Sequence, residues 1–181
     1  MSIVFIGGSR KIIHLPKEVK EKIDDLMNTD GTIYIGDENG TDKRIQKYLA
    51  EKGYEKVVIF YIESLCRNNI GKWETREINK IKKKKDFEYY AIKDLTMLLE
   101  SDYGLMIWDG ISKGTLRNII YLVSNNKQVF VYVSPEKSMY ELNTHKDLDI
   151  FLFKADKNNI SKELISAIKE INNAQVEIKF I

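Results

Sequence analysis

Residues 103–119 read YGLMIWDGISKGTLRNI, and they decide the fold of this chain. An apolar run (residues 105–108) stops at Asp109 and Gly110, and apolar side chains then recur at helical spacing over residues 116–123. This pattern predicts a buried strand, a tight turn and the N-terminus of a helix. The first amides of such a helix have no internal partners, and with the helix dipole they form a site for an anion, most often a phosphate. An ordinary strand-to-helix connection that contains a glycine is the alternative interpretation.

The loop within this stretch supplies the groups of the predicted anion site. Gly110 and Gly114 are expected to allow backbone angles and close approaches that a Cβ would block. Ser112, Gly114 and Thr115 are expected to hold the phosphate, with Lys113 beside them.

The composition limits the classes of protein to consider. The chain has 181 residues, of which 43% are hydrophobic and 31% charged, which is typical of a soluble globular domain. The net charge of +2 gives no strong attraction to nucleic acid or to a membrane surface. Cys66 is the single cysteine, so an internal disulfide is excluded and a reducing compartment is favoured. With no apolar run long enough to cross a membrane and no signal segment, we expect a cytoplasmic protein with one domain over residues 1–181.

A second loop of interest follows the first apolar run, residues 2–6. It contains Gly7, Gly8, Ser9 and Arg10. The two glycines are expected to let the chain turn sharply at the end of a strand, which places Ser9 and Arg10 beside a ligand. Arg10 can bind a phosphate or a carboxylate through two hydrogen bonds, and a surface arginine is the alternative.

A third loop follows the predicted strand over residues 32–35. It runs from Gly36 through Asp37, Gly40 and Thr41 to Asp42. Capping of the next helix is the ordinary role for Asp42. Binding of a ribose hydroxyl is the functional alternative for these aspartates, because ionised carboxylates only accept hydrogen bonds.

Strands alternate with helices along the chain, which implies right-handed crossovers and a parallel sheet. We therefore predict an α/β protein with a Rossmann-like, doubly wound, mostly parallel sheet of five or more strands and helices on both faces. Because all three glycine-bearing loops follow strands, they are expected to meet at the carboxyl edge of this sheet, where ligands bind. The strands are predicted at residues 2–6, 32–35, 56–62, 105–108 and 128–133.

The middle of the chain is less regular. In residues 63–85, Trp73, Arg76 and Ile78 are expected to form a short amphipathic turn or lid. The lysines at 82–85 are interpreted as a solvated loop, with a nucleic-acid patch as the alternative.

The C-terminal part, residues 136–181, is expected to complete the fold as an extension. Residues 136–149 show no clear period and are expected to be a surface excursion, and residues 150–153 a short strand. An amphipathic helix is predicted at 160–171 and an edge strand at 176–181.

Several standard sites are disfavoured. The chain lacks the glycine patterns GxGxxG and GxxxxGK[ST], which argues against dinucleotide-redox enzymes and P-loop NTPases. His14 and His145 stand in no metal-ligand spacing. The sequence predicts neither a metal site nor a bound cofactor.

Three segments resemble the SLOG superfamily: Gly7-Gly-Ser-Arg10, Gly36-Asp-Glu-Asn-Gly-Thr-Asp42 and Ser101-Asp-Tyr-Gly-Leu-Met-Ile-Trp-Asp-Gly-Ile-Ser-Lys-Gly-Thr115. This Rossmann-like group contains the LONELY GUY (LOG) phosphoribohydrolases, DprA/Smf and the YspA-like and YpsA-like proteins. The likeness covers residues 1–135 and is nearest to the YspA-like branch. It implies a site for nucleotides or nucleotide-derived ligands, and a homodimer.

The chain departs from the catalytic LOG pattern at two positions. LOG enzymes carry a glutamate three residues after the threonine that Thr115 matches, and here that position is Asn118. They also carry an arginine four residues before the methionine that Met97 matches, and here that position is Lys93. An asparagine cannot act as a carboxylate, and lysine does not replace arginine at a bidentate site. LOG-type hydrolysis through these two groups is therefore disfavoured.

Two hypotheses follow from the sequence. The first is a sensor or binding protein for a nucleotide-derived ligand, and the second is an N-glycosidase that cleaves a nucleoside phosphate or an NAD-like substrate. In the second, Asp42 or Asp109 would serve the sugar and stabilise the positive charge that builds on it, and Asp37 is a further candidate. Binding of single-stranded DNA, by analogy with DprA, is a weaker third hypothesis, and no membrane partner is expected. The predicted ligand-binding residues are Gly7, Gly8, Ser9, Arg10, Gly36, Asp37, Gly40, Thr41, Asp42, Asp109, Gly110, Ser112, Lys113, Gly114 and Thr115.

Overall fold

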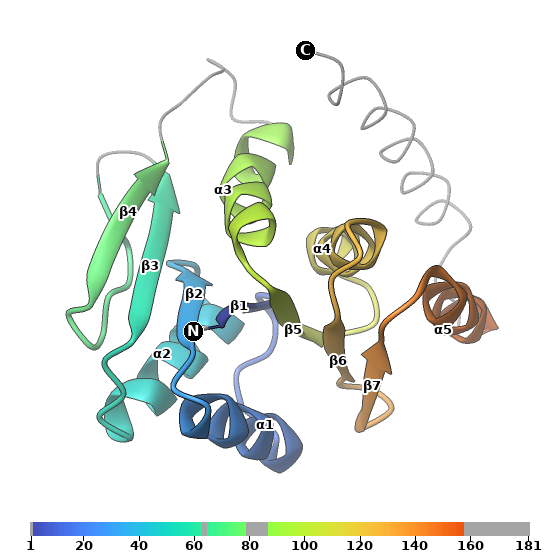
Figure 1. Cartoon of the computed structure of the whole chain (residues 1–181), viewed down its shortest axis with the longest axis horizontal. Coiled ribbons are helices and arrows are strands. Elements are labelled where there is room, and N and C mark those ends of the chain that lie inside the picture. Colours follow the sequence, from blue (N-terminus) through green and yellow to red (C-terminus); the bar gives the residue numbers. More distant parts are fainter. Residues whose placement is uncertain (1, 63–64, 79–86, 158–181) are drawn as a thin grey trace.

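A computed structural model describes residues 2–62, 65–78 and 87–157 of the chain. In these residues a sheet of seven strands has the order β4-β3-β2-β1-β5-β6-β7, as Figure 1 shows. Neighbouring strands are parallel except for β7, which pairs with β6 in the antiparallel sense. The strands are β1 (Ile3–Gly8), β2 (Thr32–Gly36), β3 (Val57–Ile62), β4 (Glu74–Ile78), β5 (Tyr103–Trp108), β6 (Val129–Val133) and β7 (Ser138–Leu142).

Helices cover both faces of the sheet, which confirms the predicted doubly wound α/β class (Figure 1). The helices α1 and α2 lie on one face, and α3 and α4 lie on the other, with α5 packed beside α4 and β7. Among these described helices, none has the length and the apolar character that a membrane crossing requires. The helices are α1 (Lys17–Asn28), α2 (Thr41–Glu51), α3 (Phe87–Glu100), α4 (Lys113–Ser124) and α5 (His145–Lys157).

The continuous apolar character of the central strands follows from this layering. Side chains alternate between the two faces of a strand, and both faces are buried here. In β1, Val4 and Ile6 pack with the α1/α2 core, whereas Phe5 packs with the α3/α4 core. In β5, Ile107 and Trp108 divide between the two cores in the same way. Each fully buried side chain of this size stabilises the fold by about 1.5–3 kcal/mol.

The strand order places the three glycine-bearing loops together. The chain moves outward from β1 through β2 and β3 to β4, and then returns to the other side of β1 with β5. Between β1 and β5 the direction of winding therefore reverses, and the carboxyl ends of β1, β2 and β5 open toward the same edge. Ligands of open α/β sheets bind at such a reversal point.

The two glycines of the first loop differ from the prediction. Gly7 and Gly8 belong to β1 and are not in the left-handed region, so they do not form a sharp turn. Gly8 is required by close packing instead. A Cβ there would lie 2.5 Å from the carbonyl oxygen of Ile107 and 2.8 Å from a side-chain carbon of Thr41.

The expectation of a lid in the middle of the chain is wrong. Residues 74–78 form the edge strand β4, which pairs in parallel with β3, and Trp73 directly precedes it. Because β4 is largely exposed, it carries no alternating apolar pattern that sequence reasoning could detect. The lysines at 82–85 lie outside the described residues.

The C-terminal predictions also need correction. Part of the expected surface excursion is β7, and the expected strand at residues 150–153 lies inside α5. The start of α5 has a reciprocal cap, because the Thr144 amide donates to the Asp147 carboxylate at 2.9 Å and the Asp147 amide donates to the Thr144 hydroxyl at 3.2 Å. This capping box was a detectable signal. The helix and strand predicted at 160–171 and 176–181 lie outside the described residues.

Candidate functional site

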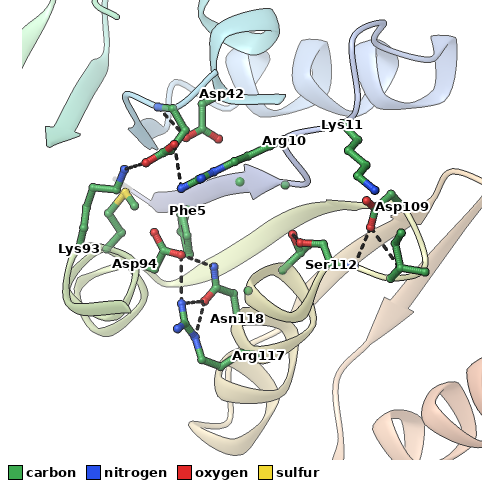
Figure 2. A pocket seen from close by; sticks show the side chains of 17 residues that line it. Phe5, Arg10, Lys11, Asp42, Lys93, Asp94, Asp109, Ser112, Arg117 and Asn118 are labelled. Atoms are coloured by element: carbon green, nitrogen blue, oxygen red, sulfur yellow. Dashed lines mark hydrogen bonds and ion pairs between the residues drawn. The ribbon is translucent and has the colours of Figure 1, made fainter. Parts of the chain in front are cut away.

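A cavity of about 490 Å³ opens at the carboxyl edge of the sheet (Figure 2). Its walls come from the end of β1 and the loop after it, the start of α2, one side of α3, and the β5–α4 connection. A volume of this size suits a small organic ligand. The lining residues are Phe5, Gly7, Gly8, Arg10, Lys11, Glu38, Asp42, Lys93, Asp94, Met97, Asp109, Ile111, Ser112, Gly114, Thr115, Arg117 and Asn118.

One end of the cavity is formed by the first turn of α4, residues 112–115, which we call the α4 end. Ser112 is the N-cap residue, but its hydroxyl makes no capping hydrogen bond. The amides of the next three residues precede the first intrahelical bond, so the helix itself does not satisfy them. A Cβ at Gly114 would have no neighbour within 4 Å. The space beside this turn is therefore open, and Gly114 is not required by close packing, contrary to the prediction.

Asp109 holds the loop before α4 in shape. Its Oδ1 accepts hydrogen bonds from the amides of Ile111 at 3.1 Å and Ser112 at 2.8 Å. Its own amide donates to the Ser9 hydroxyl at 3.1 Å. Gly110 has a φ of 83°, the left-handed conformation that glycine adopts readily. The Asp109 carboxylate therefore stabilises the loop, although it also faces the cavity.

A group of buried hydroxyls joins the loops beneath the cavity. Ser9 is almost completely buried, and its hydroxyl lies 3.4 Å from that of Thr115. The Thr41 hydroxyl donates to the carbonyl oxygen of Ser9 at 2.8 Å. These side chains fix β1, α2 and α4 relative to one another. Ser9 and Thr41 support the cavity from behind and do not line it.

The opposite side of the cavity carries ionisable side chains and one amide. We call Asp42, Lys93, Asp94, Arg117 and Asn118 the charged end. Figure 2 shows Lys93 and Asp94 across the cavity from Ser112. Because desolvation disfavours charge, buried ionisable groups require partners.

Lys93 and Asp37 form a buried ion pair behind this end. The Lys93 amine lies 3.0 Å from Asp37 Oδ1, and Arg67 binds both oxygens of the same carboxylate at 3.0 Å. Burial raises the pKa of Asp37, but the hydrogen bonds from Arg67 and the charge of Lys93 outweigh it and hold this pKa below its usual value. Asp37 is fully buried and does not line the cavity, so a contact with ligand is disfavoured.

Asp42 has the opposite electrostatic environment. Burial raises its pKa to about 7, the positive charge of Lys93 opposes this only in part, and the negative charges of Asp94 and Glu38 add to it. The Glu38 amide donates to its carboxyl at the long distance of 3.4 Å. Asp42 therefore exchanges a proton near neutral pH at the wall of the cavity. It does not cap α2, since the N-cap residue is Gly40.

Asp94 is held by two donors from α4. Its Oδ2 accepts hydrogen bonds from Asn118 Nδ2 at 2.9 Å and from Arg117 Nη2 at 3.2 Å. Figure 2 shows the Asp94 and Asn118 side chains pointing toward one another. The side chain of Asp94 is 25% exposed, whereas that of Arg117 is 5% exposed. The Asp94 carboxylate is thus held in place at the cavity by a buried guanidinium.

Arg10 and Lys11 add positive charge above the cavity. An Arg10 Nη2 atom lies 3.0 Å from the Glu38 carboxylate, and the Arg10 side chain is 64% exposed. Figure 2 shows Arg10 lying over the cavity and Lys11 reaching toward Asp109. Both side chains can move toward an anion at little cost in burial.

The structure brings together about half of the predicted binding residues. Those that line the cavity are Gly7, Gly8, Arg10, Asp42, Asp109, Ser112, Gly114 and Thr115. Others shape or support the loops without lining it, namely Ser9, Gly36, Asp37, Gly40 and Thr41. Lys113 is exposed outside it, and Gly110 lines a neighbouring cavity.

Two of the supporting glycines have clear packing roles. A Cβ at Gly36 would collide with Asp42 Oδ2 and lie 2.9 Å from the Lys93 amine. Gly40 has a φ of 87°, and a Cβ there would collide with the backbone of Arg10. At both positions this loop therefore approaches its neighbours more closely than a side chain would permit.

Sequence reasoning missed several cavity residues, chiefly Glu38, Asp94 and Arg117. Lys93 and Asn118 entered only through the family resemblance. One sequence signal for Arg117 and Asn118 is their place among the apolar positions that α4 buries. Buried polar side chains require hydrogen-bond partners, which indicates a polar site nearby. Their partner Asp94 lies in another helix, and nothing in the local sequence identifies it.

Comparison of the chain with family models, with curated proteins and with solved structures finds no match. Within the described ranges, no three His, Cys, Asp or Glu side chains gather as a metal-ligand set.

Proposed function

We propose that the cavity binds a nucleotide or a nucleotide-derived ligand and that the protein acts as a sensor or binding protein. The observation that carries this proposal is the first turn of α4, whose uncapped amides border an open cavity of about 490 Å³. Such amides, with the positive end of the helix dipole, stabilise a phosphate. Lys11, which Figure 2 shows reaching toward Asp109, adds positive charge near this turn, and Arg10 adds positive charge over the cavity.

The charged end supports a sugar next to that phosphate. The Asp94 side chain is paired with Arg117 and is partly exposed, so its carboxylate oxygens can accept hydrogen bonds from ribose hydroxyls. Phe5 and Met97 supply apolar surface in the same cavity, against which a sugar or a base can pack. A ligand with an anionic group at one end and hydroxyls or N–H groups at the other fits this arrangement.

Calorimetric titration tests the requirement for phosphate. The four common ribonucleoside monophosphates and the corresponding nucleosides are titrated separately into the purified protein. We expect at least one monophosphate to bind, and its nucleoside to bind at least about 30-fold more weakly, since charge-assisted hydrogen bonds to the phosphate are lost. Equal affinity for nucleoside and monophosphate would contradict the phosphate position.

Membership of the SLOG superfamily is part of the proposal. The two positions at which LOG enzymes carry glutamate and arginine, Asn118 and Lys93 here, both line the cavity, which supports the correspondence. A homodimer and a cytoplasmic location are further proposals from the sequence, and light scattering with multi-angle detection would test the first.

Hydrolysis of an N-glycosidic bond is a second candidate function. It is favoured by one observation: the cavity holds two carboxyl groups in contrasting states, Asp94 paired with Arg117 and Asp42 with its pKa raised to about 7. Such a contrast separates an acid from a stabilising carboxylate. Asp42 would donate its proton to the leaving base, and Asp94 would stabilise the positive sugar and accept a proton from the attacking water.

Chromatography distinguishes the two functions. The protein is incubated with nucleoside monophosphates, NAD and ADP-ribose, and free base or nicotinamide is measured. If the protein is a hydrolase, Asp42→Asn should abolish release, whereas Asp109→Asn should reduce it through loop distortion. Intact ligands that nevertheless bind in calorimetry would support the binding protein.

A further inference from the structure

A second cavity, of about 360 Å³, lies beside the first. Its inner part is apolar and is lined by Trp108, Phe151 and Ala155, which are all buried. The ring centroids of Trp108 and Phe151 are 5.8 Å apart. Water in contact with such a surface is displaced favourably by an apolar or aromatic group.

The rim of the second cavity is aromatic and polar. Tyr140 packs edge-on against Phe151, with ring centroids 5.4 Å apart, and its hydroxyl donates to Glu136. The Lys154 amine lies 5.6 Å from the centre of the Tyr140 ring. An aromatic inner surface with polar groups at its mouth is typical of sites that take a flat ring with polar edges.

The two cavities share one thin wall, the loop of residues 109–112. Asp109 and Ile111 line both cavities, and Ile111 is 60% exposed between them. A Cβ at Gly110 would lie 3.4 Å from Pro135 on the far side of this wall.

The position of this wall determines which part of a ligand can reach the second cavity. The loop runs directly into the α4 end, where the proposed phosphate lies, whereas the charged end lies on the far side of the first cavity (Figure 2). A nucleoside monophosphate placed in this orientation has its phosphate next to the wall. A group attached to that phosphate would lie beside the loop that separates the first cavity from the second.

We propose that the second cavity is a subsite for a second planar ring joined to the nucleotide through its phosphate, so that the ligand is a pyrophosphate-linked dinucleotide. This inference rests on the proposed function. It adds the class of ligand, because a mononucleotide would leave the aromatic cavity empty.

The test uses three ligands that share one adenosine phosphate. AMP has the phosphate alone, ADP-ribose adds a second phosphate and ribose, and diadenosine diphosphate adds a second base to these. ADP-ribose and the dinucleotide carry the same pyrophosphate charge, so their difference reports the second ring. We expect the dinucleotide to bind at least about 10-fold more tightly than ADP-ribose, since stacking on an aromatic surface is worth about 1–3 kcal/mol per base.

Two variants and one control variant locate the effect. Tyr140→Ala removes one aromatic wall of the second cavity. It should reduce the affinity for the dinucleotide to that for ADP-ribose and leave the affinity for AMP unchanged. Lys154→Glu should weaken binding of the dinucleotide by about 3-fold or more, because the new negative charge repels the pyrophosphate. Lys146→Glu is the control, since Lys146 lies on the same helix but outside the cavity, and it should leave this affinity unchanged. Thermal unfolding of each variant controls for folding.

The outcomes separate the two proposals. If AMP binds but the dinucleotide binds no better than ADP-ribose, the second subsite is overturned and the proposed function stands. A dinucleotide advantage that survives Tyr140→Ala would also overturn the assignment to this cavity. If none of the three ligands binds and the four ribonucleoside monophosphates also fail, the proposed function itself is lost.

Discussion

The two ends of the main cavity are built in different ways. The α4 end presents backbone amides and an open space at Gly114, with no Cβ in the way. At the charged end, side chains from α3 and α4 form an ion pair and hydrogen bonds with one another, and Lys93 of α3 pairs with Asp37 behind them. The α4 end can therefore bind an anionic group of a ligand. The charged end has already neutralised most of its own charge, which makes it a part of the fold as well as of the site.

This difference predicts that substitutions at the two ends will affect different properties of the protein. At the charged end, removal of one ion-pair partner should reduce the stability of the protein. At the α4 end, substitution should reduce binding with little effect on stability. Each of the following substitutions tests one side of that contrast, in order of expected effect.

The largest effect is expected for Asp37→Asn. It leaves Lys93 buried without its closest carboxylate, and loss of one partner of a buried pair costs about 3–5 kcal/mol. Urea denaturation measures the free energy of unfolding. Asp24→Asn is the control, because Asp24 pairs with Lys52 at the surface and its loss should cost less than about 1 kcal/mol. Similar losses for the two variants would contradict a special role for the buried pair.

Gly114→Asp should reduce affinity for a monophosphate more than about 100-fold, equivalent to about 2.7 kcal/mol, because it places a negative side chain where the phosphate is proposed to bind. The fold should be retained, since a Cβ there meets no neighbour within 4 Å. Gly114→Ala is the matched control, with binding within a few-fold of the wild type. Calorimetry gives the affinities, and unchanged affinity in the aspartate variant would exclude phosphate at this turn.

Asp42→Asn should change how stability depends on pH. The pKa of Asp42 in the folded protein, about 7, lies above the reference value of 3.8. Between these two pH values the folded state therefore binds more protons at this carboxyl group than the unfolded state does. As the pH rises from about 4 to about 7, this group lowers the free energy of unfolding by at most about 1.4 kcal/mol per pH unit.

The asparagine variant lacks this contribution. The free energy of unfolding of the variant minus that of the wild type should therefore be larger at pH 8 than at pH 5. The expected increase is on the order of 2 kcal/mol. Urea denaturation of both proteins at the two pH values measures this. Parallel pH profiles would show that Asp42 is ionised normally and would remove the acid proposed for hydrolysis.

The smallest effect is expected for Lys11→Ala. Lys11 is exposed at the edge of the cavity, so its attraction to a phosphate is screened by salt. We expect binding to weaken about 3–10-fold at low salt and less at high salt. Lys17→Ala, which removes an exposed lysine away from the cavity, is the control. Equal affinities of the two variants at low salt would place the phosphate away from Lys11.

The contrast between the ends also explains what the sequence could predict. The α4 end is local: a strand, a turn and a helix N-terminus follow one another in residues 103–119, and the apolar periodicity and the glycines identify them. The sheet class follows from the same periodicity. The strand β4 has no apolar alternation to detect because it is an exposed edge. The apolar run at residues 150–153 is typical of a strand but lies inside α5, whose start is marked by the capping box of Thr144 and Asp147.

The charged end is not local. Asp94 and Asn118 are 24 positions apart, and Asp37 and Lys93 are 56 apart. Their contacts depend on how α3 packs against α4 and β2, which no local pattern encodes. The same reason explains why Asp37 was predicted to face a ligand: its sequence position is suitable, but Arg67, from the segment after β3, binds its carboxylate behind the cavity.

The central claim is that a nucleotide phosphate binds to the first turn of α4, and amide chemical shifts test it most directly. A ¹⁵N-labelled sample is titrated with the tightest-binding monophosphate, and the amide signals of Gly114 and Gly53 are followed, because Gly53 follows the distant end of α2. We predict that Gly114 shifts strongly and saturably while Gly53 does not move. Saturable binding that leaves Gly114 and Thr115 unshifted would contradict the account.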